Sequence, residues 1–333
     1  MADQYTVGVT AGSAFDLAVE EAVFEGLDVA FRPVDVETTD DLRRELVGVD
    51  AVLDRLLTAP YTAEVIAALD GCRAIARCGI GVDHVDLDAA TDAGMYVLNV
   101  PDYCLEEVST HALMLALALE RDLRRYDASL REGVWEKRLG EARVRRLSTM
   151  TVGLVGFGAI ARRVADKFRA FGADVVATDP YVDADEMETA GVEKVEFEPL
   201  LDRAHVVSVH TPLLDETRGM FDADAFARMR EDAYFLNVAR GGLHDEAALD
   251  AALDSGDIAG AGIDVFADEP ADRFDGTTPS FETPLARHEN VVLTPHVAWY
   301  SGAASDEKRR TAAEGIRAVF EGREPEHAAA TPE

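Results

Sequence analysis

Cysteine and long apolar runs are scarce in this 333-residue sequence, and both absences exclude classes of protein. The three cysteines, Cys72, Cys78 and Cys104, show neither a disulfide framework nor metal-ligand spacing, so we expect buried thiols and no metal site. No apolar run approaches the roughly 20 residues that a membrane-spanning helix needs. The first residues are acidic and lack the pattern of a secretory signal peptide. The sequence therefore predicts a cytoplasmic protein without membrane contact.

Positive charge is also scarce, and lysine is the scarcest source of it. The chain has 64 acidic and 32 basic residues, a formal net charge of −32, and only four of the basic residues are lysine. The carboxylates are spread along the whole chain. This composition resembles that of proteins from salt-loving cytoplasms, where salt screens the self-repulsion. An acidic surface for a basic protein partner is the alternative, and direct binding of nucleic acid is disfavoured.

Length and residue pattern predict two α/β domains. Hydrophobic residues make up 48% of the chain, which is ample for two cores. Over residues 5–100, short apolar strands alternate with helical segments, a rhythm that predicts a parallel sheet covered on both faces. The expected strands are 5–10, 28–36, 51–54, 74–78 and 96–99, and the expected helices are 16–25, 40–46, 62–69 and 87–92.

A second series of the same kind begins at Thr151. A long buried helix is expected before it, over 105–126, followed by a charged arm over 127–150 that is solvated or contacts a second subunit. A last helix is expected over 302–321, with a frayed polar tail from Arg323. Six strands fit a doubly wound dinucleotide-binding domain, and they are expected at 152–156, 175–178, 206–210, 234–239, 261–266 and 291–294.

The segment from Thr151 to Asp179 carries the most specific motif. An apolar strand leads into G-x-G-x-x-A at Gly156, Gly158 and Ala161, and a helical pattern follows. Gly156 permits a tight turn, Gly158 lets the backbone approach a pyrophosphate, and the helix N-terminus directs free N–H groups at the phosphates. Asp179 ends the next strand, at the spacing of an acid that accepts bonds from ribose hydroxyls and repels a 2′-phosphate. We therefore predict NAD as the cofactor; the alternative is a structural βαβ turn without a ligand.

Three groups that could reduce a 2-oxo acid follow strands of this second series. Arg240 follows F-L-N-V-A, Glu269 follows I-D-V-F-A-D and His296 follows V-V-L-T-P. Sites in a doubly wound sheet form beyond the carboxyl ends of the strands. Arginine binds a carboxylate or carbonyl oxygen in a fork, histidine gives a carbonyl its proton, and a bonded glutamate orients the histidine. Taken singly, each residue has an equally good structural explanation, and their joint placement favours catalysis.

A glycine loop in the first series is a candidate anion site. Gly79 and Gly81, in R-C-G-I-G-V-D-H-V-D, leave backbone N–H groups accessible to a small anion. A plain tight turn explains the same residues equally well.

Six stretches together resemble the D-isomer-specific 2-hydroxyacid dehydrogenase family over nearly the whole chain. They are R-C-G-I-G-V-D-H-V-D at 77–86, V-G-L-V-G-F-G-A-I-A at 152–161, V-S-V-H-T-P-L at 207–213, N-V-A-R-G-G at 237–242, G-I-D-V-F-A-D-E-P at 262–270 and T-P-H-V-A-W-Y-S at 294–301. The resemblance implies a flavodoxin-like substrate domain of residues 1–103 and 298–333 and an inserted Rossmann NAD domain of residues 104–297. It also implies a homodimer that interconverts a 2-oxo acid and a D-2-hydroxy acid, with hydride from NADH and a proton from His296.

The resemblance assigns a role to each matching residue. Arg240 would bind and polarise the substrate, Glu269 would pair with His296, and Asp264 would hold the nicotinamide carboxamide. Substrate contacts are expected at Gly79, Ile80, Gly81, Arg240 and Trp299. The residues expected around the cofactor are Ile80, Val108, Gly156, Gly158, Ala159, Ile160, Asp179, Thr211, Pro212, Val238, Ala239, Arg240, Asp264 and His296.

Within the family, P-D-Y-C-L-E-E-V at 101–108 and H-V-A-W-Y-S at 296–301 resemble the C-terminal binding protein branch. Trp299 would then flank a larger or thioether substrate side chain; a packing role is its alternative. Two further functions stay open: an NAD-responsive, corepressor-like binding protein with weak or no turnover, and a phosphoglycerate dehydrogenase. A formate dehydrogenase is disfavoured, because that branch pairs its histidine with glutamine. His244 stands where the family usually has an aliphatic residue, and we expect it to be a packing variant.

Overall fold

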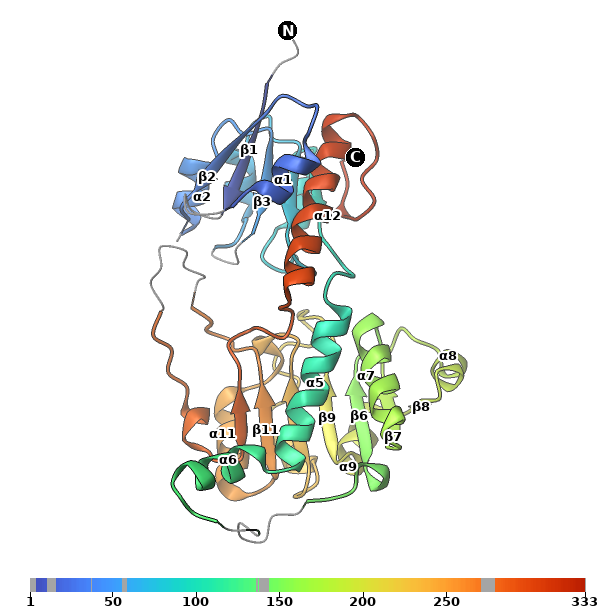
Figure 1. Ribbon diagram of the computed structural model, residues 1–333. Helices are drawn as coiled ribbons and strands as arrows, with labels where there is room; N and C mark the ends of the chain where they lie inside the picture. Colours follow the sequence, from blue (N-terminus) through green and yellow to red (C-terminus); the bar gives the residue numbers. More distant parts are fainter. Residues whose placement is uncertain are drawn as a thin grey trace. The chain divides into compact units, whose positions relative to one another are not determined.

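The computed structural model describes residues 4–10, 16–36, 38–55, 59–135, 137, 144–270 and 279–332. The chain folds as two compact units (Figure 1). Unit 1 comprises Met1–Tyr103, Pro270–Ser280 and Ser301–Glu333, and unit 2 comprises Cys104–Glu269 and Phe281–Tyr300. Each unit has its own sheet, which confirms the prediction of two parallel-sheet α/β domains. Within the described ranges, no helix combines the length and the apolar character needed to cross a bilayer.

The sheet of unit 1 has the strand order β13-β5-β4-β3-β1-β2. Strands β1 to β5 are parallel, and their spatial order is typical of flavodoxin-like folds. Strand β13 pairs antiparallel with β5. The strands are β1 (Tyr5–Thr10), β2 (Val29–Val34), β3 (Ala51–Asp54), β4 (Ala74–Arg77), β5 (Tyr96–Leu98) and β13 (Ala328–Ala330).

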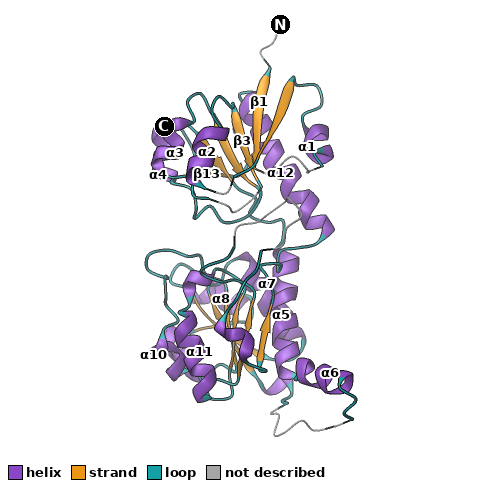
Figure 2. Cartoon of the chain, turned by 90° about the vertical axis from the view of Figure 1, so that its left-hand side faces the viewer, coloured by secondary structure: helices purple, strands orange, loops and turns teal. Residues whose placement is uncertain are grey.

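Helices cover both faces of this sheet (Figure 2). The apolar faces of α2 (Thr39–Glu45), α3 (Ala63–Ala68) and α4 (Leu87–Asp92) share one core with alternate strand residues. Helices α1 (Ala18–Val23) and α12 (Gly302–Phe320) pack together, and α12 lies against β3 and β4. A buried ion pair joins these two helices, because Arg309 Nε donates to Glu20 Oε1 at 2.8 Å. This pair fixes the C-terminal helix to the N-terminal part of the chain.

The sheet of unit 2 is parallel throughout, in the order β12-β11-β10-β9-β6-β7-β8. The chain reverses its direction of travel across the sheet between β6 and β9, and ligands of doubly wound folds bind at such a switch point. The strands are β6 (Thr151–Val155), β7 (Asp174–Thr178), β8 (Glu193–Lys194), β9 (Val206–Val209), β10 (Tyr234–Asn237), β11 (Gly260–Ile263) and β12 (Val291–Leu293).

Two helix layers enclose the unit 2 sheet. Helix α5 (Leu105–Glu120) packs on α7 (Ala159–Ala170) and contacts β10 to β12. The opposite layer contains α9 (Phe197–Arg203), α10 (Ala223–Arg228) and α11 (Glu246–Ser255). Its core includes edge-to-face rings, with the Phe226 and Phe235 centroids 5.1 Å apart. The remaining helical segments are α6 (Leu123–Arg131), α8 (Ala184–Thr189), η1 (Leu147–Thr149), η2 (Gly241–Leu243) and η3 (Pro284–Arg287).

The expectation of one helix over 105–126 is wrong. Helix α5 ends at Glu120, and Asp122 adopts a left-handed conformation with φ of 50° before α6 begins. Aspartate tolerates this conformation better than most residues do, so apolar periodicity on both sides concealed the break. The arm expected over 127–150 includes residues 136 and 138–143, which lie outside the described residues.

The expectation of a frayed tail from Arg323 is also wrong. Residues Ala328–Ala330 form β13 on the open edge of β5. The residue pattern also predicted no strand at Glu193–Lys194, where β8 extends the sheet of unit 2 beyond β7. Both strands are very short and rest on pairing with a distant edge, which no local periodicity reveals.

Candidate active site

The loop after β6 has the geometry of a phosphate cradle. Gly156 has φ of 88°, and a Cβ placed on it would lie 2.8 Å from the backbone of His210 and Thr211. Only glycine fits there, because the loops after β6 and β9 approach so closely. Helix α7 begins at Ala159 with Gly158 as its N-cap, and no side chain caps its N–H groups. Gly158 and Ala159 are exposed, so these donors are accessible to a pyrophosphate.

Asp179 lies at the end of β7 with a fixed carboxylate. Its Oδ2 accepts a hydrogen bond from Phe157 N at 2.8 Å, and its Oδ1 accepts one from Tyr181 N at 2.8 Å. Each carboxylate oxygen has a second lone pair, so the group retains capacity for ribose hydroxyls. A carboxylate with free acceptor capacity fits the ribose hydroxyls of NAD, and the negative charge of Asp179 opposes the 2′-phosphate of NADP.

His296 and Glu269 contact each other, as the strand-end argument predicted. The His296 Nδ1 atom lies 2.7 Å from Glu269 Oε2, and both side chains are about 30% exposed. Glu269 is itself held, because its Oε1 accepts from Phe266 N at 2.8 Å. His296 has φ of 50°, an unusual conformation for a residue other than glycine, and its N–H donates to Asp264 O at 2.7 Å. Among the described residues, His296 Nε2 forms no hydrogen bond, whereas Nδ1 contacts the glutamate.

Asp264 anchors the loop that carries His296. Its carboxylate is completely buried and accepts from Thr294 Oγ1 at 2.5 Å, from Val297 N at 3.0 Å and from Ala298 N at 2.9 Å. These contacts lie on both sides of His296 in the sequence. The sequence had suggested a cofactor contact for Asp264, and the structure shows a buried carboxylate that holds the histidine loop.

Arg240 lies in a loop that Asn237 organises. The buried Asn237 amide donates to Arg240 O at 2.8 Å and accepts from Ala239 N at 3.0 Å. The next residue, Gly241, lies directly against the loop that leads to Glu269, since a Cβ on it would be 1.9 Å from Phe266 C. The arginine loop and the glutamate loop are therefore in backbone contact. Sequence analysis missed Asn237, although its position at a strand end three residues before Arg240 was a usable signal.

His244 is a buried residue of this loop system. It is 5% exposed, and its Nδ1 lies 3.0 Å from the Asn237 amide nitrogen, so Nδ1 is the acceptor. Its Nε2 has no hydrogen-bond partner among the described residues. Burial lowers the pKa of His244 to about 4, so the ring is neutral near pH 7. A neutral buried ring agrees with packing rather than with a second acid.

His111 on α5 is a second residue that the sequence analysis missed. Its Nε2 lies 3.0 Å from Thr294 Oγ1 and 3.6 Å from Asp264 Oδ1. Burial lowers the pKa of His111, and the charge of Asp264 opposes this shift. A lone histidine in an apolar helix gave no signal, because its partner lies 183 residues away.

In the Gly79–Gly81 loop of unit 1, Gly79 is buried and Ile80 and Gly81 are half-buried. Its carbonyl groups are engaged, since Gly79 O accepts from Val100 N at 2.9 Å and Ile80 O accepts from Asn99 Nδ2 at 2.8 Å. In the described part of the chain, no acceptor bonds the three N–H groups of the loop. This arrangement is compatible with an anion cradle and with a plain turn.

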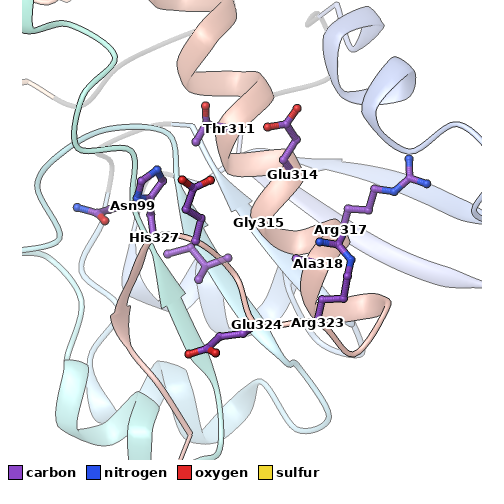
Figure 3. Close-up of a pocket in the computed structure, with 11 residues that line it drawn as sticks. Asn99, Thr311, Glu314, Gly315, Arg317, Ala318, Arg323, Glu324 and His327 are labelled. Atoms are coloured by element: carbon purple, nitrogen blue, oxygen red, sulfur yellow. The ribbon is translucent and has the colours of Figure 1, made fainter.

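Unit 1 also contains a cavity of about 420 Å³ between α12 and the segment that follows it (Figure 3). Arg317 and Arg323 line it, and both donate to Glu321. Asn99 is the lining residue that bonds Ile80 O. None of the predicted site residues lines this cavity.

The remaining residues singled out by the sequence pack against other side chains. Trp299 stacks edge-on against Tyr300, with ring centroids 5.5 Å apart, and Val108 is buried on α5. All three cysteines are buried, and burial raises the pKa of Cys72 and Cys78 to about 12, so these thiols are protonated near pH 7. The described residues contain no group of three histidine, cysteine or acidic side chains suited to a metal ion.

Comparison with known proteins identifies the class to which this fold and site belong. The sequence model of a protein family, described as D-isomer specific 2-hydroxyacid dehydrogenase, NAD binding domain, matches residues 113–298 of this chain. The chain belongs to this family, which confirms the resemblance seen in its motifs, and it contains an NAD-binding domain.

Among individual relatives, the D-3-phosphoglycerate dehydrogenase of Mycobacterium tuberculosis is 39% identical over 297 residues, which are 89% of this chain and 54% of that protein. The chain thus spans about half the length of this relative. The hydroxypyruvate reductase of Thermotoga maritima is 34% identical over 84% of this chain and 87% of that protein. The structure of D-lactate dehydrogenase from Aquifex aeolicus, complexed with NAD and lactic acid, is 25% identical with a TM-score of 0.86, covering 98% of this chain and 100% of that one.

Proposed function

We propose that the protein is an NAD-dependent D-2-hydroxyacid dehydrogenase that works as a 2-oxoacid reductase. The observation that carries this proposal is the 2.7 Å contact between His296 Nδ1 and Glu269 Oε2 in a unit with a phosphate cradle and a ribose-binding acid. In the reaction, a 2-oxo acid, NADH and a proton give a D-2-hydroxy acid and NAD⁺. Bound NADH supplies the hydride that reduces the carbonyl carbon.

The protein's own groups supply the proton and hold the substrate. Glu269 fixes the His296 ring through Nδ1, so Nε2 is the atom that gives its proton to the carbonyl oxygen. The guanidinium of Arg240 binds and polarises the same carbonyl and the neighbouring carboxylate. The N–H groups of the Gly79–Gly81 loop bind the substrate carboxylate, and Trp299 flanks its side chain. In this proposal, residues 1–103 and 298–333 serve the substrate and residues 104–297 serve NAD.

The proposed cofactor site follows the sequence assignment with one refinement. Asp179 binds the adenosine ribose, and the N-terminus of α7, with Ala159 and Ile160, binds the pyrophosphate. Because Asp264 is buried, we propose that it acts on the nicotinamide side through the loop it holds. The rest of the proposed lining is Ile80, Val108, Gly156, Gly158, Thr211, Pro212, Val238, Ala239, Arg240 and His296.

The test is NADH oxidation with a panel of 2-oxo acids in molar potassium chloride, followed by chiral analysis of the product. The panel runs from glyoxylate, pyruvate and hydroxypyruvate to phosphohydroxypyruvate and branched or thioether acids. We expect one acid to be reduced fastest, to the D-isomer. An L-product from the preferred acid would contradict the assignment.

The relatives keep phosphoglycerate dehydrogenase as an alternative, and the panel separates it directly. Preference for phosphohydroxypyruvate would select that activity. Tight NADH binding without turnover of any acid would instead select the corepressor-like binding protein.

The assembly and setting are also part of the proposal. Helix α6 and the residues after it carry exposed apolar side chains, with Leu123 59%, Leu130 56% and Trp135 78% exposed. These exposed apolar side chains support a homodimer built on unit 2. Light scattering of the wild type and of Leu130→Glu tests this, and we expect only the variant to be monomeric.

The net charge of −32 supports a salt-rich cytoplasm as the protein's setting, so the free energy of unfolding should increase with potassium chloride concentration.

A further inference from the structure

The loops that follow β7 and β9 are joined by side chains that the catalytic account does not use. Tyr181 OH donates to Glu216 Oε1 at 3.3 Å. Tyr181 is linked to the proposed ribose acid as well, because its N–H donates to Asp179 Oδ1 at 2.8 Å. The tyrosine ring is 81% exposed, so it does not hold this position as part of a hydrophobic core. The contacts place Glu216 one residue away from Asp179 in a chain of hydrogen bonds.

Both loops are ordered by their own hydrogen bonds. Thr217 Oγ1 accepts from Leu214 N at 2.8 Å and donates to Pro212 O at 2.7 Å, which closes the turn that carries Glu216. Lys194 Nζ donates to Val182 O at 2.7 Å and holds the tyrosine loop. Glu216 therefore extends from a fixed turn and not from a free loop.

No cation neutralises Glu216 within the described residues. It forms no ion pair there, and its side-chain contact is the neutral Tyr181 hydroxyl. The nearby cation on α7 is already engaged, because Arg162 Nη2 lies 2.8 Å from Glu186 Oε1 and its guanidinium stacks on Phe157. The charge of Glu216 also raises the pKa of Tyr181, in agreement with the hydrogen bond between them. Within the described residues, neither Glu216 nor Asp179 forms an ion pair, although the exposed Arg218 lies two residues from Glu216 in the sequence.

We propose that Glu216, held by Tyr181, is a second determinant of the preference for NAD over NADP. The inference rests on the proposed function, which places adenosine beside Asp179. A 2′-phosphate then meets one carboxylate on the loop after β7 and another on the loop after β9. The two repulsions act separately, so removal of Asp179 alone leaves part of the barrier against NADPH.

The test measures binding, so it does not depend on turnover. Dissociation constants of NADH and NADPH are determined by ligand fluorescence for the wild type, Asp179→Ala, Glu216→Gln and the double variant. Asp215→Asn is the matched control, since it removes one negative charge from the adjacent residue of the same turn. Tyr181→Phe removes the hydroxyl that positions Glu216 and keeps the ring.

We expect Glu216→Gln to tighten NADPH about fivefold, the size of one screened charge interaction, and to leave NADH within about twofold. Tyr181→Phe should give a smaller shift in the same direction, and the double variant should exceed Asp179→Ala. Potassium chloride should improve NADPH binding to the wild type more than to Glu216→Gln. An unchanged NADPH constant in Glu216→Gln, or an equal shift in Asp215→Asn, would overturn the proposal.

The outcomes separate this inference from the proposed reaction. If the binding shifts occur but no 2-oxo acid is reduced, the role of Glu216 stands and the dehydrogenase assignment fails. If a 2-oxo acid is reduced and Glu216→Gln leaves the NADPH dissociation constant unchanged, the dehydrogenase assignment stands and the role of Glu216 fails.

Discussion

Gly241→Ala tests the backbone contact between the loop that carries Arg240 and the loop that leads to Glu269. Gly241 follows Arg240, and a Cβ on it would lie 1.9 Å from Phe266 C and 2.2 Å from Phe266 O. Real Cβ contacts stay above 3.0 Å, so the loops must separate by about 1 Å. Phe266 N is the donor that holds Glu269 Oε1, so this displacement reaches the glutamate and through it His296.

The expected magnitude follows from this displacement. A shift of about 1 Å in a catalytic group costs about a hundredfold in rate, and an overpacked backbone contact costs about 1–3 kcal/mol of unfolding free energy. We therefore expect kcat for the preferred 2-oxo acid to fall about a hundredfold. The NADH dissociation constant should change much less than kcat, because the phosphate cradle and Asp179 lie on other loops and only Val238, Ala239 and Arg240 of the proposed lining lie on the displaced one.

Gly242→Ala is the matched control. A Cβ at Gly242 would meet the ends of the Leu213 side chain at 3.0 and 3.2 Å, and a flexible side chain can move. Steady-state kinetics and thermal unfolding of both variants complete the experiment. If Gly241→Ala and Gly242→Ala have equal kcat and equal melting temperatures, the loop contact does not support the site.

Three further outcomes follow from buried groups. Burial lowers the pKa of His244 from the ordinary 6.5 to about 4, so below pH 6.5 the unfolded state binds a proton that the folded state refuses. The free energy of unfolding should fall by about 3 kcal/mol as the pH drops from 6.5 to 4, and urea titrations of His244→Leu should show a smaller fall. Asp264→Asn puts an amide donor where backbone N–H groups need an acceptor, so we expect about 1–3 kcal/mol less stability and a lower kcat; wild-type values would contradict the anchoring role. The buried thiol of Cys78, whose pKa is about 12, should resist thiol reagents in the folded protein and react after unfolding, and rapid labelling of the native protein would refute this.

The sequence predicted the parts of this protein that follow from local patterns. The two βαβ series, the G-x-G-x-x-A turn and the strand-end positions of Arg240, Glu269 and His296 all depend on short spacings. Parallel sheets bring the carboxyl ends of strands to one edge, so these positions predict that the three side chains lie close together. The contact between His296 and Glu269 agrees with that reasoning.

Other features depended on contacts between distant residues, and the sequence did not show them. The anchoring of the histidine loop by Asp264 and His111 joins α5, β11 and β12. The pairing of β13 with β5 depends on an open sheet edge, and the break at Asp122 depends on one backbone conformation. Each of these is decided by tertiary context, which overrides local propensity.

The most direct test of the central claim is the activity of His296→Ala beside the wild type, with NADH and the preferred 2-oxo acid in molar potassium chloride. We predict that the wild type oxidises NADH and that the variant loses about 10²–10⁴-fold in kcat, the usual contribution of a general acid, while it still binds NADH. Turnover near the wild-type rate in His296→Ala would contradict the account.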